Sequence, residues 1–511
     1  MTIIHRPGKF EKLKNNGLAL LAGVLVTLSL APFSIWPLGI AAATLLALSL
    51  HNSTPLQAAW RGWLFGVALF GSGTSWVYVS IHVYGNAPVP LAIALTTIFS
   101  MGLALFFLFT CWAYRRFQTD NLFTHSAGFA TFWILCEWLR SWFLTGFPWL
   151  FLGHAHNDSP LSGLAPITGV LGISFIVAFS GAVIAQFIVQ RSNKNPAPNK
   201  LVATAIALWL ASWALQFIDW TEKKGEPITV AMVQPATPQQ LKWNRSYYQK
   251  TLNTLTEMSA PLWGNANIVI WPEAAIPNYL DNAQEFVDAV DAHAKQNNTS
   301  LITGIPSRSE PDENNPFGES FNSVIAVGNG SGIYHKQNLV PFGEYVPLQY
   351  WLRGLIEFFD LPMSNFARGP AGQTPLSINI NDRTISLSPY LCYEIVYGDL
   401  VAKSRADILL TLSNDTWFGS SIGPDQHLQI AQLRAIENGR ELIRATNSGI
   451  TVITDERGAI TAKIPQFSQQ TLIGSVQPRS GLTPYAQFGS WPVLLVALII
   501  IIIGRRLADS D

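Results

Sequence analysis

Cys392 is the residue of this 511-residue chain whose type and position most directly suggest chemistry. It follows a predicted strand in the segment LCYEI, and it is the only one of the three cysteines outside the long apolar runs. A cysteine thiolate is a strong nucleophile once its proton has been removed. Because its own domain offers no disulfide partner, Cys392 is a buried inert thiol, one half of a disulfide to another chain, or a reactive nucleophile.

Two further residues have types that suit acid–base chemistry. Glu273 ends the segment NIVIWPE, so it stands at a predicted strand end, where it is placed to act as a general base. A helix or turn cap would use the same residue type. Lys336 lies among apolar residues in YHKQNLVPFGEYVP, and Glu344 follows it. An isolated lysine is usually a solvated surface group, but these neighbours weaken that interpretation.

Residues 221–487, which contain all of these groups, alternate between short strands and amphipathic helices. Strands are predicted at 228–234, 267–273, 300–306 and 321–328, within 384–395, at 407–415, and as a pair joined by a turn at 442–458. Helices are predicted at 243–259, 282–296 and 425–440. This alternation predicts a sheet covered by helices on both faces. In such sheets the functional groups gather where strands end.

Long apolar runs occupy residues 17–218 and 488–504. Only 13% of the chain is charged, against about 25% in ordinary globular proteins. Because a membrane-spanning helix needs about 20 apolar residues, we predict eight spans, at approximately 17–33, 35–50, 62–82, 88–114, 126–144, 161–190, 200–218 and 488–504. A signal peptide is the alternative for the first run, but further spans follow it and no cleavage site stands out.

Basic residues beside these runs predict how the chain crosses the membrane, because cytoplasmic loops carry an excess of lysine and arginine. If the spans alternate from a cytoplasmic N-terminus, the flanking basic residues all fall on the cytoplasmic side. They are Arg6, Lys9, Lys12, Lys14, Arg61, Arg115, Arg116, Arg191, Lys194, Lys200, Arg505 and Arg506. Both termini are then expected in the cytoplasm and the domain at 221–487 outside.

Few polar residues lie within the predicted spans. Glu137 and Arg140 are three residues apart and so share a helix face. They form either a structural pair or part of the lining of a lipid-access cavity. Cys111 and Cys136 lie in apolar runs and are expected to be small core residues.

Composition excludes several classes of protein. Lysine plus arginine (32) balances aspartate plus glutamate (32), so nothing favours nucleic acid as the main ligand. Three cysteines cannot build a disulfide scaffold or a four-thiolate zinc site. His335 and His427 lie in no spacing typical of metal ligands, so we predict no metal, and no glycine-rich phosphate-binding loop is present.

The motifs around the three candidate residues resemble those of the nitrilase superfamily, whose triad is Glu–Lys–Cys. They are WPE, HK followed by LVPFGEYVP, and LCYE, with LSNDTWFG and RAIENGR after them. One membrane-embedded branch, the apolipoprotein N-acyltransferases, is similar along nearly the whole chain, including LAPF and GFPWL. The resemblance implies a multi-pass α-helical membrane bundle of about eight spans that carries a nitrilase-like αββα sandwich outside the membrane.

This resemblance also implies domain limits and a location. The domains are expected at 1–220 (seven spans), 221–487 (the catalytic domain) and 488–511 (the last span and a cytoplasmic tail). The expected location is the bacterial inner membrane, with the catalytic domain in the periplasm.

The reaction implied is acyl transfer through a thioester on Cys392. Glu273 would be the general base, and Lys336, with a backbone N–H near Tyr393, would stabilise the oxyanion. The donor would be a membrane phospholipid, phosphatidylethanolamine by resemblance. The acceptor would be the α-amino group of the S-diacylglyceryl cysteine of an apolipoprotein. No cofactor is expected.

Other residues match the same motifs. Glu344, Tyr393 and Glu394 are expected to support the triad or to position substrate. Trp243 matches a tryptophan on a mobile loop near the lipid entrance, although it also suits a plain interfacial tryptophan.

Two alternatives stay open. A membrane-anchored nitrilase-like amidase would use water and a small amide, for which a single anchor would suffice. A transporter or sensor with an external binding domain would need charged or broken spans near the middle of the membrane. That second reading leaves the motifs around Cys392 unexplained.

Overall fold

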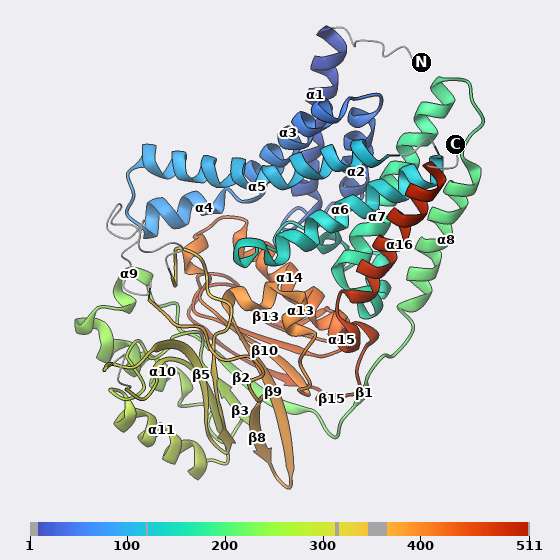
Figure 1. Cartoon of the computed structure of the whole chain (residues 1–511). Coiled ribbons are helices and arrows are strands. Elements are labelled where there is room, and N and C mark those ends of the chain that lie inside the picture. The colour runs from blue at the N-terminus through green and yellow to red at the C-terminus, as the bar shows by residue number, and fades with distance from the viewer. Residues whose placement is uncertain (1–8, 119–120, 312–315, 346–364, 509–511) are drawn as a thin grey trace. The chain divides into compact units, whose positions relative to one another are not determined.

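The computed structural model describes residues 9–118, 121–311, 316–345 and 365–508, which include every candidate catalytic residue but not Arg6. Contacts divide the chain into two compact units. The helical unit comprises Met1–Tyr78, Val89–Ile218 and Phe488–Asp511, and the α/β unit comprises Val79–Pro88 and Asp219–Gln487. Figure 1 shows the helices and strands of the chain and labels many of them.

The helical unit has a helix over most of each apolar range predicted from the sequence. These helices are α1 (Lys9–Ser29), α2 (Pro37–Leu50), α3 (Pro55–Gly73) followed by the short α4 (Trp76–Val79), α5 (Val89–Phe117), α6 (Leu122–Trp142), α7 (Ala165–Ser192), α8 (Asn199–Leu215) and α16 (Trp491–Ala508). Within the described residues, Val89–Phe117 and Pro160–Ser192 are long and apolar enough to cross a membrane. A bent pair, Pro55–Gly73 with Trp76–Tyr84, brings that number to three.

Local sequence explains where these helices begin and which faces they expose. Thr54 caps α3 in a reciprocal capping box with Gln57, and Pro55 fills the first helical position. Helix α5 exposes large apolar side chains, among them Ile98 and Phe109, which are 66% and 62% exposed. Such an apolar surface is stable in lipid and costly in water, so this unit belongs in a membrane.

Glu137 and Arg140 have a structural role in the helical unit. The Glu137 carboxylate accepts hydrogen bonds from the Trp133 indole (2.9 Å) and from the backbone N–H of Leu152 (2.8 Å). Arg140 donates to the backbone carbonyl of Trp149 at 3.0 Å. Both side chains therefore fasten the irregular backbone after α6 to that helix, which favours the structural pair. Cys111 and Cys136 are buried, as predicted.

The α/β unit contains two large sheets packed face to face. One has six strands in the order β14-β2-β3-β4-β5-β7, and the other has seven in the order β13-β12-β11-β10-β9-β8-β6. Their bounds are β2 Ile228–Gln234, β3 Ile268–Ile270, β4 Ser300–Arg308, β5 Ser320–Gly328, β6 Gly330–Ser331, β7 Ile333–His335, β8 Leu376–Ile380, β9 Arg383–Leu391, β10 Ile408–Ser413, β11 Leu442–Thr446, β12 Thr451–Thr454, β13 Ile460–Ile464 and β14 Gln470–Val476. A separate pair joins β1 (Glu222–Lys223) to β15 (Arg479–Ser480).

Successive side chains of each strand point to opposite faces of its sheet, and this alternation separates the layers of the unit. In β2, Val230 and Met232 enter the core between the two sheets, whereas Ala231 and Val233 face the opposite way. That second face is covered by α10 (Tyr248–Ser259) and α11 (Gln284–Gln296).

Helix α14 (Gly423–Asn438) packs on the other sheet, where its Leu428 contacts Val452 of β12. The short helices are α9 (Gln239–Lys242), α13 (Gly398–Val401) and α15 (Pro484–Phe488). The unit is thus the α/β sandwich that the family resemblance implies. The alternation of strands and helices alone predicted a single sheet covered on both faces, whereas the structure has two sheets that each carry helices on one face.

Candidate active site

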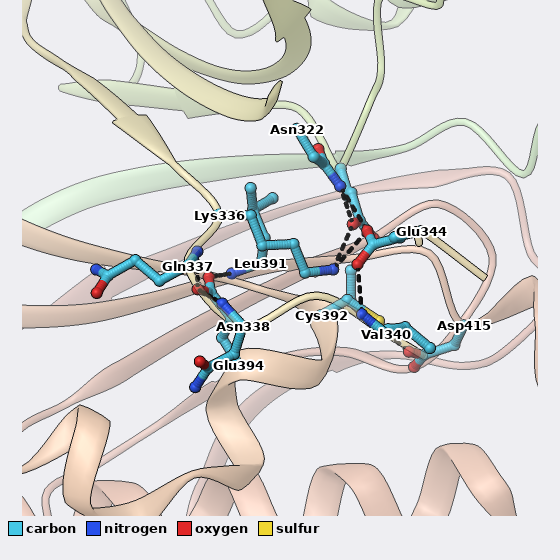
Figure 2. A network of polar contacts seen from close by, with 12 residues as sticks. Asn322, Lys336, Gln337, Asn338, Val340, Glu344, Leu391, Cys392, Glu394 and Asp415 are labelled. Atoms are coloured by element: carbon cyan, nitrogen blue, oxygen red, sulfur yellow. Dashed lines mark hydrogen bonds and ion pairs between the residues drawn. The ribbon is translucent and has the colours of Figure 1, made fainter. Parts of the chain in front are cut away.

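Strand ends bring the three candidate catalytic residues together. Glu273 follows β3, Lys336 comes directly after β7, and Cys392 directly after β9. Strands β2, β3 and β4 of one sheet are parallel to one another, as are β9, β10 and β11 of the other, so within each sheet the loops that leave their carboxyl ends lie at one edge. Figure 2 shows Lys336 and Glu344, from the segment after β7, close to Cys392.

Lys336 forms the centre of a buried charge cluster. Its ammonium lies 2.8 Å from Oε1 of Glu344 and 3.5 Å from Oε1 of Glu273, and the side chain is only 1% exposed. The amide of Asn322, from β5, donates to both carboxylates, at 2.8 Å to Glu273 and 3.0 Å to Glu344. The backbone N–H of Val340 donates to the other Glu344 oxygen at 2.8 Å. Two carboxylates therefore share one ammonium and one amide.

Burial and the neighbouring charges shift the pKa values of the groups in this cluster. Burial alone would lower the pKa of Lys336, but the charges of Glu344 and Glu273 outweigh it and raise that pKa, so Lys336 stays a cation. Burial raises the pKa of Glu273, and the nearby Glu344 charge adds to the increase, while Lys336 opposes it. Glu273 is thus a stronger base than an exposed glutamate.

Cys392 stands at a sharp turn between β9 and a 3₁₀ turn (Cys392–Val396). Its φ of 48° lies in the left-handed region, which a non-glycine residue adopts at a cost and which is typical of functional turns. Cys392 is half-buried, and burial together with the charge of Glu273 raises the pKa of its thiol to about 12. The resting sulfur is therefore a neutral thiol that needs a base before it can attack.

A second polar network, formed by His427, Asp415 and Arg444, supports the backbone of Cys392. The His427 ring lies with Nε2 3.1 Å from the Cys392 carbonyl oxygen and Nδ1 3.1 Å from Oδ1 of Asp415. Asp415 forms an ion pair with Arg444 and accepts a hydrogen bond from Ser413 at 2.6 Å. Burial lowers the pKa of His427, and the Arg444 charge lowers it further. This network fixes the backbone of the turn that carries the sulfur.

The same network brings together three potential metal-ligand atoms. The Sγ of Cys392, a carboxylate oxygen of Asp415 and a ring nitrogen of His427 lie within 4.8 Å of one another. Arg444 and Ser413 already bind the carboxylate of Asp415, and His427 contacts a backbone carbonyl. These contacts make the group a hydrogen-bonded support for the turn of Cys392, and they give no reason to place a metal there.

Glu394 links the loop of Lys336 to the turn of Cys392. Its Oε1 accepts hydrogen bonds from the backbone N–H groups of Gln337 (2.7 Å) and Asn338 (3.1 Å), and its Oε2 accepts one from Leu391 (2.8 Å). Burial raises the pKa of Glu394 to about 7. Its carboxylate is occupied by backbone donors, so its position suits support rather than reaction.

Tyr393 and Trp243 are the remaining expected residues. Tyr393 is buried, and its ring packs edge-on against Tyr397 with centroids 5.3 Å apart. Trp243 is half-buried and follows the last residue of α9. That last residue, Lys242, donates to the backbone carbonyl of Glu273 at 2.9 Å, which places it at the site although sequence reasoning passed over it.

Family models match both parts of the chain. Residues 229–485 match the model described as carbon-nitrogen hydrolase, and residues 22–183 match the apolipoprotein N-acyltransferase N-terminal domain. The α/β sandwich and the residues gathered at its strand ends thus belong to an enzyme of the carbon-nitrogen hydrolase superfamily.

Full-length relatives narrow this class. An apolipoprotein N-acyltransferase of Pseudomonas putida is 45% identical and covers all of both chains. Enzymes of the same description from Azotobacter vinelandii and Coxiella burnetii are 43% and 39% identical, over 99% and 96% of this chain and 96% and 99% of theirs. The chain belongs to the apolipoprotein N-acyltransferase family. It is a membrane acyltransferase that uses a phospholipid donor and a lipoprotein acceptor.

Two solved structures are similar to about half of this chain. A carbon-nitrogen hydrolase superfamily protein from Xanthomonas campestris covers 53% of this chain and 97% of its own, with 15% identity and a TM-score of 0.37. An amidase from Nesterenkonia covers 53% and 97%, with 19% identity and a TM-score of 0.34.

Proposed function

We propose that the acyl chain passes through a thioester on Cys392, with Glu273 as the general base and Lys336 as the electrostatic stabiliser. The observation that carries this proposal is the convergence of a half-buried thiol, a carboxylate of raised pKa and a buried ammonium at one edge of the sandwich. A base beside the thiol removes the obstacle that its high pKa presents.

In the first half of the reaction, Glu273 takes the thiol proton while sulfur attacks the carbonyl carbon of a phospholipid ester. The negative charge that develops on the carbonyl oxygen is stabilised by the Lys336 ammonium and by a backbone N–H near Tyr393. The C–O bond then breaks, the proton on Glu273 passes to the departing alkoxide, and a lysophospholipid leaves. A thioester remains on Cys392.

In the second half, the α-amino group of a diacylated apolipoprotein attacks the thioester carbon. Glu273 takes a proton from the nitrogen, the C–S bond breaks, and the proton returns to the sulfur. The products are an N-acylated lipoprotein and the free enzyme. Phosphatidylethanolamine is the proposed donor, and acyl chains that fill the site would keep water from the thioester.

Residues around the triad have supporting roles in this proposal. Glu344 keeps Lys336 charged and in place through their 2.8 Å contact. Glu394 fixes the loop that follows Lys336 against the turn of Cys392, and Tyr393 is packed within that turn. Trp243 contributes to positioning the lipid substrate.

The proposed setting is the bacterial inner membrane. Eight spans would place both termini in the cytoplasm and residues 221–487 in the periplasm, with domains at 1–220, 221–487 and 488–511. The flanking basic residues support this orientation. Apolar helices that expose large side chains support the membrane setting.

Purified protein, a phospholipid with a labelled acyl chain and a diacylated lipopeptide test the proposal. We expect label on the lipopeptide amine and formation of lysophospholipid, and neither product with Cys392→Ser. Hydrolysis of small amides without transfer to the lipopeptide would instead support the amidase alternative. Absence of both reactions in a folded wild-type protein would contradict the proposed function.

A further inference from the structure

Lys242 is a buried amine that the triad mechanism does not use. It is the last residue of α9, and its side chain is only 3% exposed. Its Nζ donates a hydrogen bond to the backbone carbonyl of Glu273 at 2.9 Å. Burial of an ammonium is costly unless opposite charge or strong acceptors compensate it, so a lysine in this place needs a reason.

The charges next to Lys242 supply that reason. Its ammonium is attracted by the Glu273 carboxylate and by the thiolate of Cys392. Glu273 and Glu344 carry two negative charges around the single positive charge of Lys336, which leaves one negative charge in excess. A protonated Lys242 makes this buried group neutral before the thiol ionises. Without it, a thiolate would form beside an uncompensated negative charge.

Hydrogen bonds hold both ends of the short helix α9, which carries Lys242 as its last residue. Gln239, at the start of α9, accepts a hydrogen bond from Asn414 at 2.7 Å, and Asn414 precedes Asp415 of the network beneath Cys392. At the other end, Lys242 donates a hydrogen bond to the backbone carbonyl of Glu273, the proposed base. Helix α9 is thus held between the two sides of the site, and the ammonium is held with it.

We propose that Lys242 is a second cation of the active site, a positioning residue that stabilises the Cys392 thiolate and keeps Glu273 ionised. This inference rests on the proposed role of Cys392 as the nucleophile. Burial lowers the pKa of Lys242 to about 8, and the charges of Glu273 and Cys392 oppose that decrease. The lysine therefore still carries its proton at neutral pH.

The test measures how fast iodoacetamide alkylates Cys392 as a function of pH. Lys242→Gln keeps a hydrogen-bond donor but removes the charge, and Lys242→Arg keeps both. The substitutions leave the other charged or titratable groups around the sulfur in place, namely Glu273, Lys336, Asp415 and His427. Lys250→Gln, at an exposed position on α10, is the matched control.

We expect Lys242→Gln to move the alkylation profile about one unit to higher pH, which makes alkylation at pH 7 about tenfold slower. Lys242→Arg and Lys250→Gln should stay within about twofold of the wild type. Acyl-enzyme formation from phospholipid should fall in parallel with alkylation.

A wild-type profile for Lys242→Gln would overturn the inference, since a hydrogen bond alone would then explain the lysine. Equal shifts for the Gln and Arg variants, or loss of the folded state in the Gln variant, would overturn it as well. These outcomes differ from failure of the proposed function, in which the wild-type Cys392 itself would not be alkylated or acylated at any pH.

Discussion

Glu344→Gln perturbs the charge cluster around Lys336 in a way whose effects can be worked out. The carboxylate binds Lys336 through Oε1 and the backbone N–H of Val340 through Oε2. An amide has only one oxygen, so its NH₂ group must face one of these two donors. A hydrogen bond to a charged group contributes about 1.5–3 kcal/mol, and loss of this one should slow acyl-enzyme formation roughly ten- to a hundredfold.

The same substitution should change the pH dependence in a predictable direction. The Glu344 charge raises the pKa of Glu273, so its removal lowers that pKa. Glu273 would then remain a base to lower pH, and the acid limb of the rate profile would move to lower pH. The slower rate and this displacement should occur together, because both follow from replacing the carboxylate by an amide.

The assay is single-turnover acylation by a labelled phospholipid, followed across pH. Glu285→Gln, an exposed carboxylate on α11, is the control and should leave both rate and profile unchanged. An acid limb that stays in place or moves to higher pH would refute the account of how Glu344 acts on Glu273.

Two further substitutions test the base and the support of the sulfur. Glu273→Gln removes the proton acceptor and should slow acyl-enzyme formation about 10²–10⁴-fold, as measured by the same single-turnover assay. A loss of less than threefold would exclude Glu273 as the base. Asp415→Asn removes the negative charge that pairs with the buried Arg444 and should destabilise the protein by about 3–5 kcal/mol. Chemical denaturation measures this, and an unchanged midpoint would show that the ion pair of Asp415 with Arg444 does not stabilise the fold.

The triad could be predicted from the sequence because its residues occupy strand ends within distinctive motifs. Glu273 and Cys392 each follow an apolar strand, and the structure brings them together with Lys336. Glu344 was expected to support the triad or to position substrate, and its carboxylate lies 2.8 Å from the Lys336 ammonium.

Other residues of the site could not be found in this way. Asn322 lies inside β5 and looks like an ordinary strand residue until the fold sets its amide between two carboxylates. Lys242 resembles a surface lysine beside a tryptophan, and only its burial reveals it. The sequence raises His427 only as a possible metal ligand, whereas its ring contacts the Cys392 carbonyl and Asp415. In each case the partner is distant in sequence, so local pattern holds no signal of it.

Two of the strands missed from the sequence, β13 and β14, have weak apolar patterns. β13 has mostly exposed side chains and β14 alternates between exposed and half-buried ones, so neither has the continuous apolar run of a central strand. Buried strands such as β2 and β10 were predicted from their β-branched and apolar runs.

Eight membrane spans remain a prediction. Helix α1 begins with several charged residues, and α2 and α8 have only 14 and 17 residues.

The most direct test of the central claim is the mass of the protein after incubation with phospholipid alone. The account predicts a gain of one acyl chain, mapped by peptide analysis to Cys392 and removed by neutral hydroxylamine, which cleaves thioesters. An acyl chain on any other residue, or a Cys392→Ser variant that still transfers acyl chains to a lipopeptide at the wild-type rate, would contradict it.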